Sequence, residues 1–505
     1  MSSNSTIAKN TIFLYVRMII IMLIGFYTVR AILDLLGVVD YGVYNVVGGV
    51  VAMFSFLNGT LASSSQRYFS VDLAKGDTIN LNKTFCLNIN VFLILAGFIV
   101  VIAETIGLWF VNYKMTIPVD RLFAANVVYQ LSIITFVISL ISVPYNALII
   151  AHEEMKAFAK ISIIEALLKL CVVAILSFTF VDRLIVYGIL MFVVSSSITA
   201  SYIVYCHHNF PESKYSLYWN KVSAFEILSF SGWHFLGTIS SVLRTQGINI
   251  LINLFFNPAV NAARAVSVQV SSAVTQLSSN FFVAVKPQMY KSYAIGDFHA
   301  LEKLIMRSTI ICAFLVSIMV IPLVICTDFV LALWLKEVPE HASLFTKLIL
   351  WHSLIYSING ATIVPALATG NIKRFEIWTS GLNCLILPIS YAVLKLGGSP
   401  ESTVVVAMIM ATLTILLQAY MLRCMLLFPF WRYVGLIVKL FIVSITLWAC
   451  LIYIPHFCSN WLLLITVTVF SLILHIILYA LFVMEKEDLA SFRTFILKKL
   501  KKHIQ

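Results

Sequence analysis

Long apolar stretches separated by short polar connections dominate the sequence. A hydrocarbon core about 30 Å thick is spanned by roughly 20 apolar residues in helical form, so each stretch of that length predicts one transmembrane helix. About fourteen are predicted, near 11–36, 42–66, 85–111, 121–150, 158–180, 184–206, 223–255, 258–285, 304–334, 343–369, 375–395, 402–425, 433–454 and 461–483. Since helices satisfy their own backbone hydrogen bonds in lipid, the pattern predicts an all-α polytopic membrane protein.

Composition agrees with this prediction and excludes a water-soluble fold. The 505 residues are 61% hydrophobic and 11% charged, with a mean hydropathy of +0.98. Soluble domains carry about 25% charged residues. The net charge of +12 would suggest nucleic acid as the partner of a soluble protein. In this chain contact with membrane lipids explains the charge, and no nucleic-acid partner is expected.

Basic residues in the connections predict the orientation of the chain, because Lys and Arg are retained on the cytoplasmic side. With the N-terminus inside, the cytoplasmic connections and tail hold 21 Lys and Arg residues, against five outside. We therefore predict a multi-pass membrane protein with both termini in the cytoplasm. Residues 485–505 are predicted to form a basic amphipathic cytoplasmic tail, either lying on anionic lipid or simply solvated.

An internal repeat predicts two related halves. At an offset of 220 residues the turn Gly76-Asp77 falls on Gly296-Asp297, and a helix rich in small and hydroxyl residues precedes each turn, at 46–67 and 266–287. Six helices separate the copies, so the halves should be parallel repeats about an axis normal to the membrane. We predict two six-helix lobes around a central cleft, 1–215 and 216–430, followed by two added helices in 431–484.

Three arginines within predicted spans are candidates for substrate binding: Arg17, Arg244 and Arg264. A charge at bilayer depth is costly unless it meets water, an anion or a partner. The planar guanidinium group binds phosphate oxygens in pairs and stays charged at any physiological pH. For Arg17, which lies about two turns inside the membrane, extension to the interface is the competing interpretation. Lys439 is likewise expected to extend toward a helix end.

Two acidic positions are candidates for coupling to H⁺ or Na⁺. Asp34 lies four residues after Arg30, and Glu165 lies four residues before Lys169, which is the spacing of an intrahelical ion pair. Mutual neutralisation is therefore one interpretation of each pair. The other is a carboxylate, with Lys169 beside Glu165, whose protonation or ion binding drives a conformational change.

Nothing in the sequence predicts a cofactor, a metal site or an enzyme. The nine cysteines are scattered without a C-x-x-C pair, and no set of ligands with metal-binding spacing accompanies them. Every connection is shorter than about 20 residues and no D-x-D motif occurs, so there is little room for a glycosyltransferase, polymerase or ligase site.

A family resemblance lies in three segments near the N-terminus: LLGVVDYGVYNVVGGVV (35–51), FLNGTLASSSQRYFS (56–70) and AKGD (74–77). These segments resemble the polysaccharide-transport branch of the multidrug/oligosaccharidyl-lipid/polysaccharide exporter (MOP) superfamily. Wzx-type O-antigen flippases belong to that branch. The resemblance implies a flippase that moves an undecaprenyl-pyrophosphate-linked oligosaccharide, an O-antigen or capsular repeat unit, from the cytoplasmic to the periplasmic leaflet by alternating access. It also implies a role in polysaccharide and lipopolysaccharide biosynthesis and leaves open a partnership with a polysaccharide polymerase complex.

The main alternative is a cation-coupled multidrug antiporter of the related MATE branch. That branch typically has twelve helices and a cavity biased toward acidic or aromatic groups, whereas this chain offers arginines and two further helices. A channel or scramblase is disfavoured because the charged candidates are spread over several helices without a repeated pore ring.

The predicted topology is testable with reporters whose activity depends on their compartment. A green fluorescent protein fused after Gly76 or at the C-terminus should fluoresce, because both positions are predicted to be cytoplasmic. Alkaline phosphatase fused after Asp182 should be active, because that connection is predicted to be periplasmic. Phosphatase activity at Gly76 together with fluorescence at Asp182 would reverse the orientation.

Overall fold

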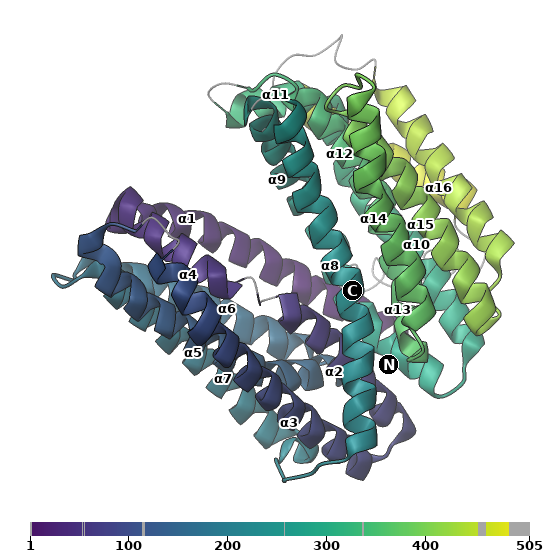
Figure 1. The fold of residues 1–505 in the computed structure, drawn as a ribbon. Coiled ribbons are helices and arrows are strands. Elements are labelled where there is room, and N and C mark those ends of the chain that lie inside the picture. The colour runs from purple at the N-terminus through teal and green to yellow at the C-terminus, as the bar shows by residue number, and fades with distance from the viewer. Residues whose placement is uncertain are drawn as a thin grey trace, which may run out of the picture. The chain divides into compact units, whose positions relative to one another are not determined.

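The computed structural model describes residues 3–52, 54, 56–113, 117–256, 258–335, 338–452 and 461–483, which are almost entirely helical and contain no strand (Figure 1). The predicted tail, 485–505, lies outside the described residues. The helices of the first half are α1 (Ser3–Ala52), α2 (Phe56–Lys75), α3 (Thr78–Ile102), α4 (Leu108–Tyr113), α5 (Leu122–Ala151), α6 (Met155–Ser177) and α7 (Arg183–Asn209).

The remaining helices are α8 (Lys221–Phe255), α9 (Pro258–Ala294), α10 (Phe298–Ile325), α11 (Thr327–Trp334), α12 (Ala342–Ser357), α13 (Gly360–Thr369), α14 (Lys373–Lys395), α15 (Ser402–Leu426), α16 (Phe430–Leu451) and α17 (Trp461–Leu478). Short π-helices at Ala103–Gly107 and Tyr479–Val483 extend α3 and α17. The chain is an all-α polytopic membrane protein, as the apolar pattern predicts.

Ten described stretches are long and apolar enough to cross a membrane. The other predicted spans overlap α2, α6, α8 and α9, which are long enough but carry more polar or charged residues than the ten. Polar residues are tolerated in a membrane helix where it faces protein or water instead of lipid. The structure is therefore compatible with about fourteen spans, and that number stays a prediction.

The first two predicted helices differ from the structure in their limits. Instead of ending near residue 36, α1 runs on to Ala52 with a kink at Gly37, whose φ of 76° and ψ of 168° are not helical. Glycine adopts a positive φ at little cost, so the chain changes direction there and the helix resumes. The second predicted segment, 42–66, is consequently divided between the end of α1 and the start of α2.

Both copies of the repeated Gly-Asp turn have the same local geometry. Gly76 and Gly296 have φ values of 70° and 77°. The following residues, Asp77 and Asp297, each accept a hydrogen bond from the backbone amide three residues later, at 2.9 Å in both cases. The turn thus ends one helix with a left-handed glycine and caps the next with an aspartate. The two copies of the weak sequence repeat therefore share the backbone geometry of this turn.

The chain divides into two compact units. Unit 1 comprises 1–238 and 283–296, and unit 2 comprises 239–282 and 297–505. In unit 1, α5 packs against α1, α2, α3, α6 and α7, and its buried aromatic residues lie in the two apolar clusters of that unit. In unit 2, α10, α12 and α15 pack together, with α13, α14, α16 and α17 against them (Figure 1). The boundaries predicted from the repeat, including the cleft between the lobes, stay predictions.

The repeated turn generates a stability prediction. Gly76→Ala and Gly296→Ala should each destabilise the protein by about 1 kcal/mol, because a Cβ disfavours the left-handed region. No atom of the described residues lies within 4 Å of the added Cβ at either position, so the cost is conformational. The measurement is the thermal midpoint of the purified protein in detergent. As a control, Gly97→Ala inside α3 also meets no neighbour and should stabilise the helix; loss of stability there as well would contradict the explanation.

Candidate functional site

A cavity of about 210 Å³ in unit 2 lies between α8, α9, α12 and α15. Helical periodicity explains which residues reach it. Its lining from α9 includes Arg264, Val268, Ser271 and Thr275, which are spaced by three or four residues and so share one face. The lining from α12 follows the same spacing, with Ile349, His352, Ser353 and Tyr356. α8 adds Arg244, Thr245 and Ile248, and α15 adds Thr403, Val404 and Ala407.

Arg264 is the most enclosed charged residue of the lining, with 7% of its surface exposed. Its Nη1 donates a hydrogen bond to Asn249 Oδ1 on α8, and the Asn249 amide donates in turn to Gln246 Oε1 at 3.2 Å. The neutral amide orients the guanidinium group without neutralising it. Arg264 Nε is buried and has no hydrogen-bond partner within the described part of the chain.

Arg244 and His352 add to the positive character of the same cavity. The Arg244 guanidinium lies 5.6 Å from the centre of the Tyr356 ring, a cation–π distance. Arg244 is close enough to Arg264 for their charges to repel, and both act electrostatically on the His352 imidazole. Because the described residues that line this cavity include no carboxylate, an anionic group entering it would relieve this repulsion.

Hydroxyl groups complete the lining. Ser271 and Ser353 are joined by a hydrogen bond of 2.6 Å between their Oγ atoms, and the Thr275 hydroxyl donates to the backbone of Ser271 at 3.1 Å. His352 Nε2, like Arg264 Nε, is buried without a hydrogen-bond partner among the described residues. Two buried nitrogen atoms without partners are costly, so the cavity is suited to a ligand or water that accepts or donates hydrogen bonds there.

Arg17, the third predicted arginine, belongs to unit 1 and packs against α6. Its Nη1 donates to Ser162 Oγ at 3.3 Å, and its guanidinium lies 4.5 Å from the centre of the Phe158 ring. It also interacts electrostatically with Glu165. The structure therefore brings Arg244 and Arg264 together in one cavity and places Arg17 beside the predicted coupling pair.

Glu165 and Lys169 form the expected intrahelical pair, with 2.6 Å between Lys169 Nζ and Glu165 Oε1. Their side chains are 37% and 41% exposed. Glu165 thus faces two cations, Lys169 on its own helix and Arg17 on α1. The Glu165 carboxylate therefore offsets part of the positive charge of Arg17 and Lys169.

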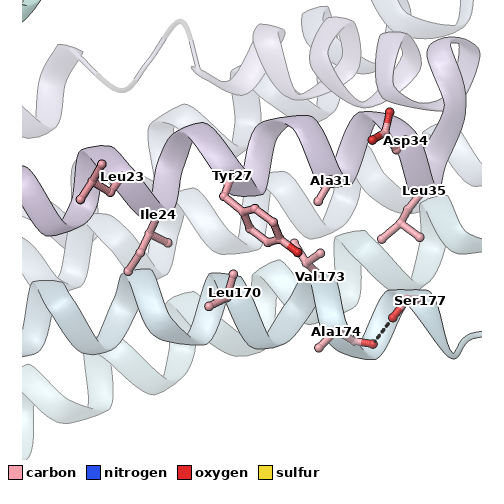
Figure 2. Close-up of a pocket in the computed structure, with 10 residues that line it drawn as sticks. All are labelled: Leu23, Ile24, Tyr27, Ala31, Asp34, Leu35, Leu170, Val173, Ala174 and Ser177. Atoms are coloured by element: carbon pink, nitrogen blue, oxygen red, sulfur yellow. Dashed lines mark hydrogen bonds between the residues drawn. The ribbon is translucent and has the colours of Figure 1, made fainter.

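Asp34, the other coupling candidate, lies at a groove of about 790 Å³ between α1 and α6 (Figure 2). Apolar side chains such as Leu23 and Leu170 line most of the groove, together with the Tyr27 ring. The Asp34 carboxylate lies at one end and is directed away from α6 (Figure 2). No ion pair joins it to Arg30 among the described side chains, and both residues are exposed. Because most of its lining is apolar, the groove itself is not suited to binding an ion.

His352 is the site residue that sequence reasoning missed. The sequence could have indicated it, because a histidine within the predicted span 343–369 is an ionisable side chain at membrane depth, as the arginines are. The sequence does not show that the face of α12 carrying His352, Ser353 and Tyr356 meets α8 and α9. Among the described residues, no group of three metal-ligating side chains lies together.

Comparison of the sequence with family models and with curated proteins finds no match. Comparison of the structure with solved structures finds several similar folds. An outward-facing multidrug resistance MATE family transporter of the MOP superfamily is 12% identical, with 84% of this chain and 97% of that chain covered, at a TM-score of 0.71.

Two further structures match at similar levels. The MATE transporter ClbM, solved in complex with Rb⁺, is 14% identical over 83% of this chain and 95% of its own, at a TM-score of 0.68. A MOP superfamily transporter from Pyrococcus furiosus, described as having a binding pocket of reverse polarity, is 10% identical over 84% and 98%, at a TM-score of 0.67. The chain therefore has the fold of the MATE transporters of the MOP superfamily.

Proposed function

We propose that the protein is a membrane transporter of the MOP superfamily that flips an undecaprenyl-pyrophosphate-linked oligosaccharide from the cytoplasmic to the periplasmic leaflet. The observation that carries this proposal is the unit 2 cavity, where Arg244 and Arg264 lie close together and no carboxylate occurs among the described lining residues. Two such cations in a low-dielectric site repel each other unless an anion lies between or beside them. A pyrophosphate group supplies that anion.

The donors in the cavity suit phosphate chemistry. A guanidinium group donates two parallel hydrogen bonds to phosphate oxygens, and the Ser271 and Thr275 hydroxyls can donate to others. The cavity volume of 210 Å³ is below the roughly 300 to 1,000 Å³ of pockets that enclose a drug-sized ligand. It therefore suits the charged headgroup alone, and the sugars and the isoprenoid chain would lie outside it.

The similar folds are consistent with transport by alternating access but do not identify the substrate. The Pyrococcus furiosus protein is described as having a pocket of reverse polarity that suggests a different function. Pocket charge therefore varies among proteins of this fold, and the charge of this chain's cavity is the better guide. Location in the bacterial inner membrane, with both termini cytoplasmic, and contact with a polysaccharide polymerase belong to the same proposal.

A cation-coupled antiporter is the second candidate, and unit 1 supplies the observation in its favour. Glu165 and Asp34 are carboxylates at membrane depth or near it, and a similar fold, ClbM, was solved with Rb⁺. Coupling to H⁺ or Na⁺ is also compatible with a flippase, so the two candidates differ mainly in substrate. Since the lining of the unit 2 cavity, as far as the structure describes it, holds arginines and no carboxylate, an anionic substrate is favoured over a cationic drug.

Replacement of Arg264 tests the flippase proposal. In a flippase-deficient strain that supplies the correct substrate, Arg264→Ala should lower surface polysaccharide per membrane-inserted protein by at least tenfold, because a charged hydrogen bond contributes about 1.5 to 3 kcal/mol. Arg264→Lys should retain part of the activity, since it keeps the charge and loses the planar fork. Lipid-linked oligosaccharide should accumulate in the inner leaflet.

The matched control is Arg30→Ala, which removes an exposed arginine outside the cavity and should export normally. A purely structural Arg264 predicts less inserted protein with unchanged export per molecule. Normal export per molecule by Arg264→Ala would therefore remove Arg264 from the site.

A second set of variants separates charge neutralisation from ion coupling at Glu165. If its main role is neutralisation, Glu165→Gln should reduce the amount of folded protein more than Lys169→Gln, because it leaves both Arg17 and Lys169 uncompensated. The double variant Glu165→Gln/Lys169→Gln should recover part of the loss. The measurement is the amount of monodisperse protein in detergent extracts. Full insertion of Glu165→Gln with transport no longer dependent on a H⁺ or Na⁺ gradient would instead assign it to coupling.

A further inference from the structure

His352 has no part in the phosphate contacts proposed above, although it lines the same cavity as Arg244 and Arg264. Its ring lies nearly parallel to that of Tyr356 one turn later on α12, with 6.0 Å between the ring centres and 17° between the ring planes. His352 Nε2 is buried and has no hydrogen-bond partner among the described residues. A buried ring nitrogen without a partner is costly, so this position of a histidine needs a physical reason.

The serine and threonine hydroxyls of the lining do not supply that partner. Ser353 Oγ donates to the Ile349 carbonyl at 2.8 Å, so Ser271 donates the hydrogen bond of 2.6 Å that joins the two serines. The threonines of the lining also donate to backbone carbonyls, at 2.8 to 3.1 Å: Thr245, Thr275 and Thr403. A hydroxyl has a single hydrogen to donate, so none of these groups is left to donate to His352 Nε2.

The two arginines affect the charge that the His352 imidazole can carry. Both act electrostatically on it, and no carboxylate occurs among the described lining residues to offset them. In a cavity of low dielectric constant, a third positive charge beside these two is disfavoured. A phosphate group bound between the arginines changes this balance, because it attracts a proton on His352 while the arginines repel it. The charge of His352 therefore depends on whether an anion is bound.

Titratable groups on the helices packed against α12 have partners outside the cavity. Two ion pairs, with distances of 2.9 and 2.6 Å, lie near the start of α12: Lys347 with Asp328 before it on α11, and His341 with Glu401 before α15. On α10, Cys312 donates from its thiol to a carbonyl at the end of α12 at 3.1 Å. None of these residues lines the cavity, so Arg244, Arg264 and a bound anion are the charges that act on His352 there.

We propose that His352 takes up a proton when the anionic headgroup binds in the cavity, so that the imidazolium donates a hydrogen bond from Nε2 to a phosphate oxygen. Solvent supplies the proton, and no other covalent bond forms or breaks. This role rests on the function proposed above, because it requires a substrate that carries phosphate charge. It makes H⁺ the ion that binds together with the substrate, in the unit 2 cavity and apart from the carboxylates of unit 1.

Binding of the proton and binding of the anion then strengthen each other. Linkage between two binding sites is reciprocal, so each ligand raises the affinity for the other by the same factor. As the pH rises through and above the ordinary titration range of histidine, less of the protein carries the proton. The affinity for the anion should therefore fall by up to about tenfold for each unit of pH.

The test is a calorimetric titration of the purified full-length protein in detergent with dimethyl pyrophosphate. This diester lacks the phosphate group that titrates near neutral pH, so its charge does not change between about pH 6 and about pH 8. Titrations in two buffers with different heats of ionisation give the number of protons taken up for each anion bound. We expect this number to approach about one, and the affinity to fall by at least about tenfold from the lower to the higher pH.

His352→Gln separates proton uptake from a purely structural role. Glutamine keeps a hydrogen-bond donor but does not titrate in this range, so the variant should bind the diester without proton uptake and with an affinity independent of pH. The matched control is His208→Gln, which removes an exposed histidine at the end of α7 in unit 1 and should leave the proton uptake unchanged.

Two results would overturn this role of His352 and leave the proposed substrate class in place. They are binding of the diester to the wild-type protein without proton uptake, and an unchanged uptake in His352→Gln. The first needs no variant, so the test does not depend on the folding of His352→Gln. If the wild-type protein does not bind the diester at any pH, both this role and the proposed function are wrong.

Discussion

The cost of placing charge in hydrocarbon governs the arrangement of this protein. A chain with 11% charged residues spans the membrane many times, so each charge within a span requires a partner, water or a route to the surface. The structure shows different solutions. Lys169 pairs with Glu165 on its own helix, Arg17 contacts a hydroxyl and an aromatic ring on α6, and Arg264 bonds to an uncharged amide. The Glu165 carboxylate offsets the charges of Lys169 and Arg17, whereas Asn249 leaves the charge of Arg264 available to a ligand.

That difference gives the unit 2 cavity its chemical character. Asn249 holds the Arg264 guanidinium in place, and an amide does not reduce its charge as a carboxylate would. Arg244 is held near the Tyr356 ring, which also leaves its charge intact. The cavity is therefore organised and positive before any ligand arrives, which reduces the cost of binding an anion.

The repeated Gly-Asp turn shows how a short segment organises two helix pairs in the same way. A glycine with positive φ ends α2 in one copy and α9 in the other, and the aspartate that follows caps α3 or α10. Both helices that precede the turn are too polar to count among the ten apolar spans. In unit 2 this polar helix, α9, supplies Arg264 and the hydroxyls of the cavity. The polar residues that lower the hydropathy of α9 therefore include those that line the cavity.

The sequence by itself determined the class of the protein, the positions of most helices and the residues worth examining. These properties are local, because hydrophobicity over about 20 residues and a Gly-Asp pair each act on their own segment. Arg244 and Arg264 stood out individually because charges in apolar segments are rare. Only the tertiary structure decided that these two share a cavity with His352, that Arg17 lies beside Glu165, and that α1 continues through Gly37. Helix partners are selected by packing between faces, and in lipid the apolar residues of one helix do not distinguish another helix from the hydrocarbon around it.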